Sequence, residues 1–262
     1  MNNENKLPDE FKYSPESKTA KKLDNFWYYH KWKVIGAIFA VFVIVVCVYS
    51  CLSKPEKDIA LLYAGPYSSY DESVLNINAE LTEIMPESFK DKGAVLTVLE
   101  IYTAEQIKAL AEKEVEDYLK ETKEELSAEE IAGLINRQEN SLSQLTTTNS
   151  KSLSSYLQMG NYSIYLLDPA VYEQYRSVGV FAKLSDVFGD DIPESAVSDD
   201  AIKLSETEFY KKSSNGIGNL PEDTLLCIRV KPVFGTGCSG ERGNDKEYDK
   251  AVEMFKKIVN YK

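Results

Sequence analysis

The sequence predicts an α/β domain with a mainly parallel sheet, preceded by a single transmembrane helix. Two observations predict this fold class. The run from Val34 to Leu52 is apolar throughout and carries no charge, and a helix of that length spans roughly 28 Å, close to the hydrocarbon thickness of a bilayer. Beyond this run, short apolar segments typical of buried strands alternate with amphipathic segments typical of helices, which is the order that gives a parallel sheet.

The apolar run divides the chain into three predicted parts. These are a cytoplasmic tail (1–33), the transmembrane helix (34–52) and an extracytoplasmic α/β domain (53–262). Several lysines lie shortly before the run, whereas only Lys54 and Lys57 follow it closely. Positive charge is retained on the cytoplasmic side of a membrane. We therefore expect a single-pass protein of the cell membrane with its amino terminus in the cytoplasm.

Two alternatives to an uncleaved anchor stay open. A cleaved signal peptide has an apolar core of about 7–15 residues and a small-x-small cleavage site, and Val48-Tyr49-Ser50 matches that site poorly. The segment Val48-Tyr49-Ser50-Cys51 resembles a bacterial lipobox with a bulky tyrosine two positions before the cysteine, so lipidation of Cys51 is the second alternative. All three interpretations export the domain.

The first half of the domain begins with a strand at 58–64, a short apolar run that ends at the turn signal Gly65-Pro66. A helix at 69–85 follows, with an apolar face and a stop at Pro86. The next strand, 94–102, is dense in the residues that favour strands. Thr103 to Gln106 and Ser127 to Glu130 both have the form of a capping box, so we expect a helical insertion over 104–150. The polar run 146–150 predicts a linker or a cap before a short helix.

The second half predicts two further strands and two helices. The strand 162–167 turns at Asp168-Pro169 into a helix at 171–177. The segment 190–205 is acidic and irregular, and a weak strand is expected near Phe209. A strand at 225–230 and an amphipathic helix at 245–261 complete the domain.

Composition excludes several classes of function. The chain carries 42 Asp and Glu against 30 Lys and Arg, and an acidic surface repels phosphate backbones, so we expect no nucleic-acid partner. The single histidine, His30, precedes the apolar run, which excludes a Ser-His-Asp or Cys-His hydrolase in the exported domain. With so few His and Cys residues we expect no metal site. We also expect no cofactor and no enzymatic activity, and the many acidic residues leave only a carboxylate pair for glycoside cleavage open.

Glycine and cysteine near the carboxyl terminus suggest two further features. Gly235 to Gly240 matches G-x-G-x-x-G, but the dinucleotide fingerprint also needs a following strand with an acidic residue about 20 positions on. We therefore expect a flexible glycine loop. Cys227 and Cys238 lie in the exported part, where a disulfide can form. A bridge between them and two unpaired thiols are both open.

The stretch 157–188 contains the most informative order of motifs. A helix is followed by Gly160-Asn161-Tyr162, a strand at 163–169, Gly179 and the run 181–186. This order resembles a segment of the extracellular solute-binding proteins, in which such a strand carries a residue toward the ligand cleft. The run 214–221 is similar to the glycine and proline passage that leads back to the other lobe in that family, and 63–66 is similar to its first strand and cleft loop.

The resemblance covers about residues 58–235 and implies a lobe of the periplasmic-binding-protein type. It also implies a short, membrane-anchored form of the kind found in Gram-positive bacteria. Full solute-binding proteins have two lobes and longer chains, so a second lobe is expected to be small or missing here.

The candidate site follows from the predicted sheet. In an open α/β sheet, ligands meet the loops at the carboxyl ends of the strands. The residues that we expect to bind a ligand there are Tyr67, Ser68, Thr103 and Asp168. Tyrosine offers a flat contact face with one polar group, and amide groups at the starts of the following helices can hold a carboxylate. The alternative is that all four are turn or cap residues.

Two functions follow as expectations. The first is a single-pass, membrane-anchored, extracytoplasmic solute-binding-like protein that is not an enzyme and binds or senses a small ligand. The second is a structural or accessory protein of the cell envelope whose α/β domain contacts another protein. In both cases the membrane is contacted through Val34 to Leu52.

Overall fold

The computed structural model describes residues 18–52, 59–67, 71–87, 93–124, 126–231 and 245–261. The chain divides into two compact units, Met1–Pro55 and Glu56–Lys262. The first unit contains one long helix, and the second contains a sheet covered by helices.

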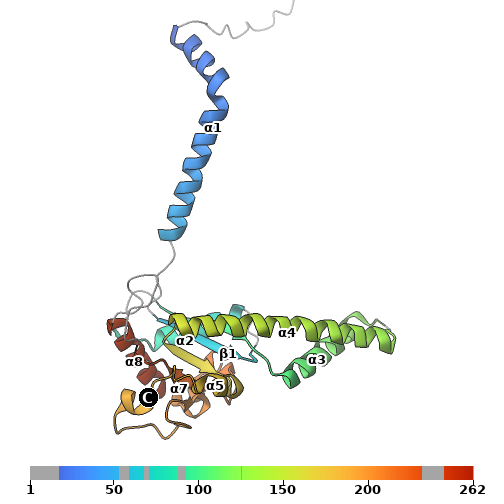
Figure 1. Ribbon diagram of the computed structural model, residues 1–262, viewed down its shortest axis with the longest axis vertical. Coiled ribbons are helices and arrows are strands. Elements are labelled where there is room, and N and C mark those ends of the chain that lie inside the picture. The colour runs from blue at the N-terminus through green and yellow to red at the C-terminus, as the bar shows by residue number, and fades with distance from the viewer. Residues whose placement is uncertain are drawn as a thin grey trace, which may run out of the picture. The chain divides into compact units, whose positions relative to one another are not determined.

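Helix α1 (Lys18–Leu52) forms the first unit and is drawn in blue in Figure 1. Its stretch His30–Cys47 is long and apolar enough to cross a membrane, judged by length and composition. Apolar side chains are exposed on all sides of this stretch, among them Phe39 at 66% and Phe42 at 63%, as is typical of a helix that faces lipid. The prediction of one apolar N-terminal helix is confirmed, although the helix begins at Lys18, well before Val34.

A sheet with the strand order β2-β1-β3-β5-β4 forms the centre of the second unit. β1 is parallel to β2 and to β3, whereas β5 is antiparallel to β3 and to β4. The α/β class is confirmed, but the sheet is mixed and the prediction of a mainly parallel sheet is not. The strands are β1 (Ile59–Gly65), β2 (Ala94–Glu100), β3 (Ile164–Leu167), β4 (Ile202–Lys203) and β5 (Leu225–Ile228).

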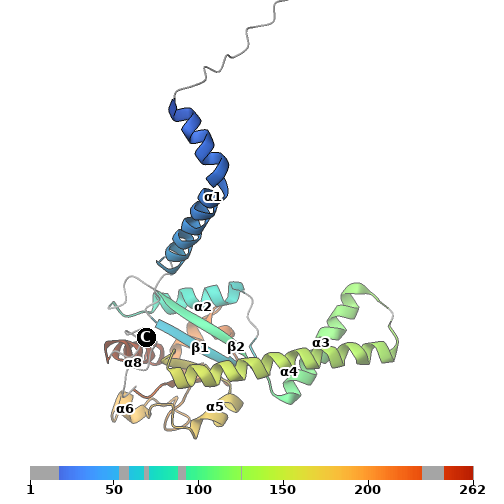
Figure 2. The same ribbon diagram turned by 45° about the horizontal axis from the view of Figure 1, so that its top comes forward.

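Helices cover both faces of this sheet (Figure 2). Along β1, Leu61 and Tyr63 pack into one core with α2 (Asp71–Glu83) and α8 (Asp245–Val259). Leu62 and Ala64 pack into the other core with α4 (Ala128–Met159) and α5 (Pro169–Arg176). Successive side chains of a strand point to opposite faces, and burial on both faces explains why β1 is apolar without alternation.

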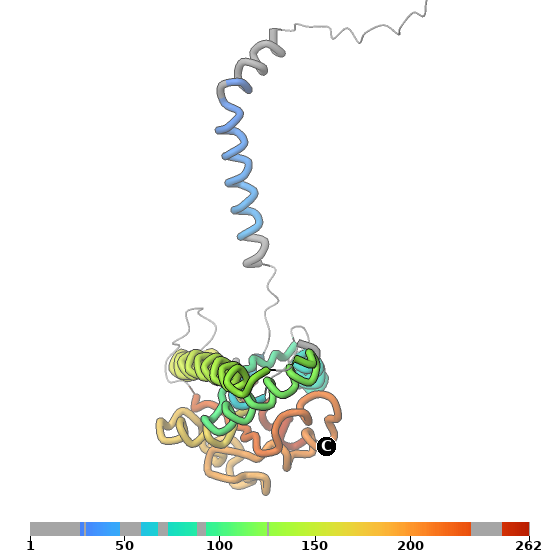
Figure 3. The backbone as a smooth tube through the Cα atoms, turned by 90° about the vertical axis from the view of Figure 1, so that its right-hand side faces the viewer, coloured from blue at the N-terminus to red at the C-terminus, as the bar shows by residue number. Residues whose placement is uncertain are grey.

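Helices α3 (Ala104–Thr122) and α4 form a hairpin that extends beyond the sheet (Figures 1 and 2). Both predicted capping boxes are confirmed, with Thr103 bonded to Gln106 and Ser127 bonded to Glu130. Only the last turns of the 32-residue α4 pack on the sheet, through Leu153 and Leu157. We call residues 104–145, which pair the rest of α4 with α3, the arm. Figure 3 shows α4 nearly end-on from the side to which the arm points.

The expected linker at 146–150 is wrong, because α4 is continuous through it. Thr147 and Thr148 donate hydrogen bonds to carbonyl groups one turn earlier in the helix. Thr146 Oγ1 accepts from the amide of Tyr102 at 3.3 Å, and Asn149 Nδ2 donates to the carbonyl of Glu100 at 2.9 Å. The polar run therefore joins α4 to the end of β2 instead of separating two helices.

The connection from β3 to β5 differs most from the expectation. β4 lies inside the segment that was expected to be irregular. The weak strand expected near Phe209 is instead the helix α7 (Glu208–Lys212), because the Thr207 side chain accepts from the amide of Tyr210 and so caps a helix. The remaining elements are α6 (Leu184–Phe188) and the 3₁₀ turns η2 (Leu204–Glu206) and η3 (Ile217–Asn219).

Candidate functional site

The carboxyl ends of the parallel strands β1, β2 and β3 lie together, as expected. We call this end of the sheet the carboxyl edge. A fourth segment, 204–224, joins them there, because Lys203 and Leu167 both pair with Leu225 at the start of β5. In the strand order, β2 lies next to β1 on one flank and β3 lies next to β1 on the other. The connections from β1 to β2 and from β2 to β3 therefore run in opposite directions across the sheet. Such a topological switch point is where open α/β sheets bind ligands.

β1 and β3 approach each other closely at this edge. The amide of Asp168 donates to the carbonyl of Ala64 at 2.9 Å. A Cβ atom on Gly65 would lie 2.6 Å from the Tyr63 hydroxyl oxygen and 2.9 Å from Asp168 Cβ. The amide of Tyr67 donates to the Tyr63 hydroxyl oxygen at 3.3 Å, and the two rings meet edge to face. The structure therefore places Tyr67 and Asp168, two of the predicted site residues, close to the buried Tyr63.

Asp168 is a buried carboxyl group in an acidic environment. Its Oδ1 accepts from the amide of Ala170 at 2.8 Å and so caps α5, while only 8% of the residue is exposed. Burial raises the pKa of Asp168, and the nearby charge of Asp223 raises it further. Burial likewise raises the pKa of Tyr63, with smaller contributions from both aspartates. Among the ion pairs formed by the described residues, none includes Asp168.

Asp223 and Thr224 belong to this edge but were not foreseen. The register of β3 and β5 pairs Leu167 with Leu225, so its next position places Thr224 beside Asp168. Thr224 is fully buried, and its Oγ1 has no hydrogen-bond partner within the described ranges. The turn at Pro221 could be found from the sequence, but its place beside β3 depends on the antiparallel direction of β5.

Of the other two predicted residues, only Thr103 lies in the part of the chain that the structure describes. Thr103 is exposed and caps α3, with its Oγ1 3.2 Å from the amide of Gln106. Ser68 lies outside the described residues. The amides of Gln106 and Ala170 are thus already bonded to cap side chains, so these two helix starts do not favour a bound carboxylate.

A second polar group lies on the opposite face of the sheet. The Tyr172 hydroxyl bonds to Asp200 Oδ1 at 2.5 Å and to Ser198 Oγ at 2.7 Å. Burial, together with the bond to Asp200, raises the pKa of Tyr172 to about 12. No histidine accompanies this serine and aspartate, so the group lacks the general base of a hydrolase. Its hydrogen bonds instead join α5 to the turn before β4.

Cys227 on β5 is fully buried and forms no disulfide with another of the described residues. Burial raises the pKa of this thiol, and the charge of Asp200 acts in the same direction, so the group is a poor nucleophile. Cys238 and the glycine run 235–240 lie outside the described residues, and the disulfide stays a prediction. Within the described ranges, no group of three His, Cys, Asp or Glu residues could hold a metal ion.

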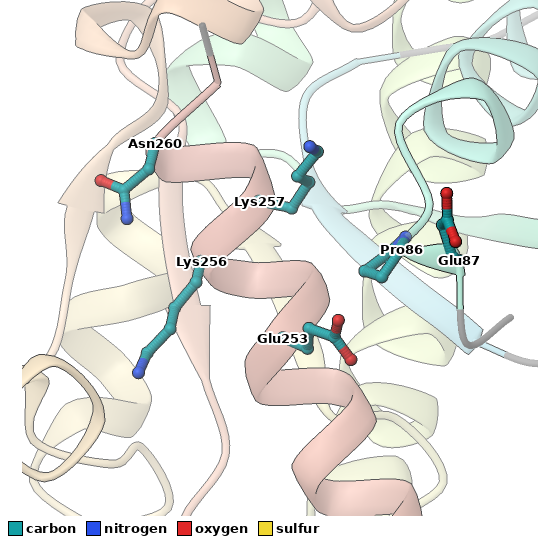
Figure 4. A pocket seen from close by; sticks show the side chains of 6 residues that line it. All are labelled: Pro86, Glu87, Glu253, Lys256, Lys257 and Asn260. Carbon is teal, nitrogen blue, oxygen red and sulfur yellow. The ribbon is translucent and has the colours of Figure 1, made fainter.

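Two surface cavities are lined by residues other than Tyr67, Asp168, Asp223 and Thr224. One, of about 460 Å³, is bounded by α8 and the segment after α2 (Figure 4). In that view Glu253 and Lys257 lie on the side of α8 nearer Pro86, whereas Lys256 lies on the other side, and its Nζ is 5.7 Å from the centre of the Phe188 ring. The other cavity, of about 480 Å³, lies at the tip of the arm.

Comparisons with protein family models, with curated proteins and with solved structures found no match to this chain. No relative therefore assigns a ligand or a partner to the carboxyl edge or to the arm. The similarity to solute-binding proteins stays a prediction from short motifs.

Proposed function

We propose that this chain is a single-pass membrane protein whose α/β domain lies outside the cytoplasm and binds a small ligand without catalysis, in the manner of a solute-binding protein lobe. The observation that carries the proposal is the group formed by Tyr63, Asp168 and Thr224 at the switch point between β1 and β3. Buried polar groups are nearly always paired. A buried hydroxyl without a partner beside a buried carboxyl group therefore favours a ligand at this edge.

The charges at this edge favour a small primary amine. Asp168 and Asp223 both contribute negative charge there, and Asp168 retains one carboxyl oxygen beyond the one that caps α5. An ammonium group can donate to that oxygen and to a hydroxyl oxygen at the same time. The half-buried ring of Tyr67 offers a flat surface to the rest of the molecule.

The test is a ligand panel against the full chain in detergent micelles, read by thermal unfolding and by calorimetry. We expect lysine or putrescine to bind, and glucose and succinate not to bind. Asp168→Asn is expected to weaken amine binding about 10- to 100-fold, the loss of a hydrogen bond to a charged group. Asparagine caps a helix as well as aspartate does, so the fold should be retained.

Two controls sharpen this test. Asp199→Asn removes a charge from an exposed position and should leave binding unchanged. Because burial raises the pKa of Asp168, protonation should abolish amine binding at a higher pH than the usual value for aspartate, about 3.9. Equal binding by Asp168→Asn and the wild type, or no binding by any member of the panel, would contradict the proposal.

The proposed orientation is tested separately. An epitope tag at each end of the chain, with protease added to intact spheroplasts, should give loss of the carboxyl-terminal tag and protection of the amino-terminal one. The physical reason is the excess of lysines before the apolar run. The opposite pattern of protection would overturn the orientation.

A second function, an accessory protein of the cell envelope, is favoured by the arm. Two helices extend beyond the sheet and bury only a small core of their own around Ala111 and Leu142. This part of α4 adds nothing to the two cores of the sheet. A projecting helical pair with an acidic surface is suited to contact another protein, and we propose such a contact as the second candidate function.

A further inference from the structure

We propose that the tip of the arm is a docking site for a lysine or arginine side chain on a basic segment of a partner protein. The inference rests on the second function proposed above, and the small-ligand site does not enter it. It depends on the cavity between the end of α3 and the first turns of α4. Its lining includes Tyr118, Glu124, Glu129, Glu130, Gly133 and Leu134.

The rim of the cavity carries negative charge at fixed positions. Glu124 Oε2 accepts from the Tyr118 hydroxyl at 3.2 Å. Glu130 Oε2 accepts from the amide and the hydroxyl of Ser127, and these bonds lower the pKa of Glu130. Glu129 has no ion-pair or hydrogen-bond partner among the residues that the structure describes. The cavity is lined by three carboxylates and by the single guanidinium of Arg137. The net charge of its rim is therefore negative and complements a cation.

The walls of the cavity are apolar and suit the stem of a basic side chain. Tyr118 is 44% exposed, and an aromatic face attracts a cation placed over it. Leu126 and Leu134 are half-buried and line the same cavity. Lysine and arginine bury their methylene stems on apolar surface while the charged head stays among polar groups. A basic side chain therefore matches both the wall and the rim.

Gly133 is the observation that neither helix geometry nor packing explains. It lies inside α4, where glycine lowers helix stability relative to alanine. Its φ is not positive, and a Cβ atom at this position would meet no atom within 4 Å. The fold would accept alanine here. What the glycine does provide is backbone without a side chain in the lining of the cavity. A docked side chain can lie close to the helix there, beside Arg137, whose Nε donates to the Gly133 carbonyl at 3.3 Å.

The test measures binding of a fluorescent peptide of alternating lysine and leucine to the full chain in nanodiscs, by anisotropy. Gly133→Ala is expected to raise the midpoint of thermal unfolding and yet weaken peptide binding about 10-fold, because the added methyl group overpacks the occupied cavity. Glu129→Gln should weaken binding about 3-fold, as for the loss of an exposed ion pair. Ser141→Ala, an exposed position farther along α4, also replaces a poorer helix former by alanine, and as the matched control it should leave peptide binding unchanged.

Three outcomes would overturn the docking site. The first is that Gly133→Ala binds the peptide as tightly as the wild type does. The second is that a peptide with glutamate in place of lysine binds as tightly as the lysine peptide. The third is that spermine binds as tightly as the lysine peptide and loses the same affinity in Gly133→Ala. The last would identify a small polycation as the occupant instead of a protein.

Photocrosslinking in native membranes separates the docking site from the function on which it rests. A photoreactive residue at position 129 should give an adduct whose yield falls in Gly133→Ala. Adducts from position 141 but not from 129 would overturn the docking site and leave the accessory function standing. The absence of adducts from both positions would overturn both.

Discussion

Gly65→Ala is expected to lower the free energy of unfolding of the domain by about 3 kcal/mol, the upper part of the range for overpacking a buried site. The added Cβ would lie 2.6 Å from the Tyr63 hydroxyl oxygen and 2.9 Å from Asp168 Cβ. Tyr63 is fully buried and cannot swing into solvent, so the ends of β1 and β3 must separate. The measurement is urea unfolding of the full chain in detergent, followed by circular dichroism.

A double-mutant cycle assigns this loss to its cause. Tyr63→Phe alone should cost about 1 kcal/mol, the usual contribution of one hydrogen bond, because the bond from the Tyr67 amide is lost. Combined with Gly65→Ala it should cost less than the sum of the two, because the hydroxyl that the new Cβ meets is then absent. Gly133→Ala is the control, since its Cβ meets no neighbour. A loss of less than about 0.5 kcal/mol in Gly65→Ala, the range of an ordinary surface substitution, would show that the two strands are not in close contact.

The close approach of β1 and β3 limits where a ligand can bind. No room exists between the strands for even a methyl group on Gly65. A ligand must therefore bind on the outer side of the edge, against the half-buried Tyr67 and the remaining oxygen of Asp168. Thr224 is fully buried, and its hydroxyl becomes accessible only if segment 204–224 moves. An amine that bonds to the Thr224 hydroxyl, as proposed above, therefore requires a displacement of that segment.

The strands and helices of the first half could be predicted because local signals there agree with the tertiary structure. β1 is apolar and ends at Gly65-Pro66, and both capping boxes at the starts of α3 and α4 form as the sequence indicates. The prediction of a linker at 146–150 is wrong because threonine and asparagine favour turns only when their side chains bond to local backbone. Here the side chains of Thr146 and Asn149 bond to the end of β2 instead, and no local signal reveals a partner so far away in the sequence.

The direction of β5 could not be predicted for a related reason. A buried strand is equally apolar in a parallel and in an antiparallel pairing, so Leu225 to Ile228 carry no mark of direction. The direction follows from the connection after β4, which returns to the same edge through α7 and η3. Asp168 and Tyr67 could be placed at the edge from β1 and β3 alone. Asp223 and Thr224 could not, because their position depends on that connection.

Glu80 on α2 holds the connection between β4 and β5 (204–224) in place. Its Oε2 accepts from Ser213 Oγ at 2.6 Å and from the amide of Ile217 at 2.9 Å, while Ser213 Oγ accepts from the amide of Gly218 at 3.0 Å. A Cβ on Gly216 would lie 2.1 Å from the same carboxylate oxygen. The loop therefore closes around a single carboxylate from a helix more than a hundred residues earlier in the chain.

Glu80→Ala is expected to lower the free energy of unfolding by about 3 kcal/mol, because each hydrogen bond to a charged group contributes about 1.5–3 kcal/mol. Urea unfolding measures this loss. Hydrogen exchange at the Ile217 amide should become faster, since its acceptor is removed. Glu83→Ala, an exposed position on the same helix, is the matched control and should stay within about 0.5 kcal/mol of the wild type.

Because the loop around Glu80 leads into Asp223 and Thr224, the same substitution should also loosen the carboxyl edge. Glu80→Gln keeps one acceptor oxygen without the charge, so its loss of stability should be intermediate. Gly216→Ala should be less harmful in Glu80→Ala than in the wild type, because the carboxylate that its Cβ meets is then absent. If Glu80→Ala unfolds like Glu83→Ala while the Ile217 amide stays protected, the loop is held by the apolar contacts of Ile217 and Leu220 alone. The carboxylate would then have no part in positioning the edge.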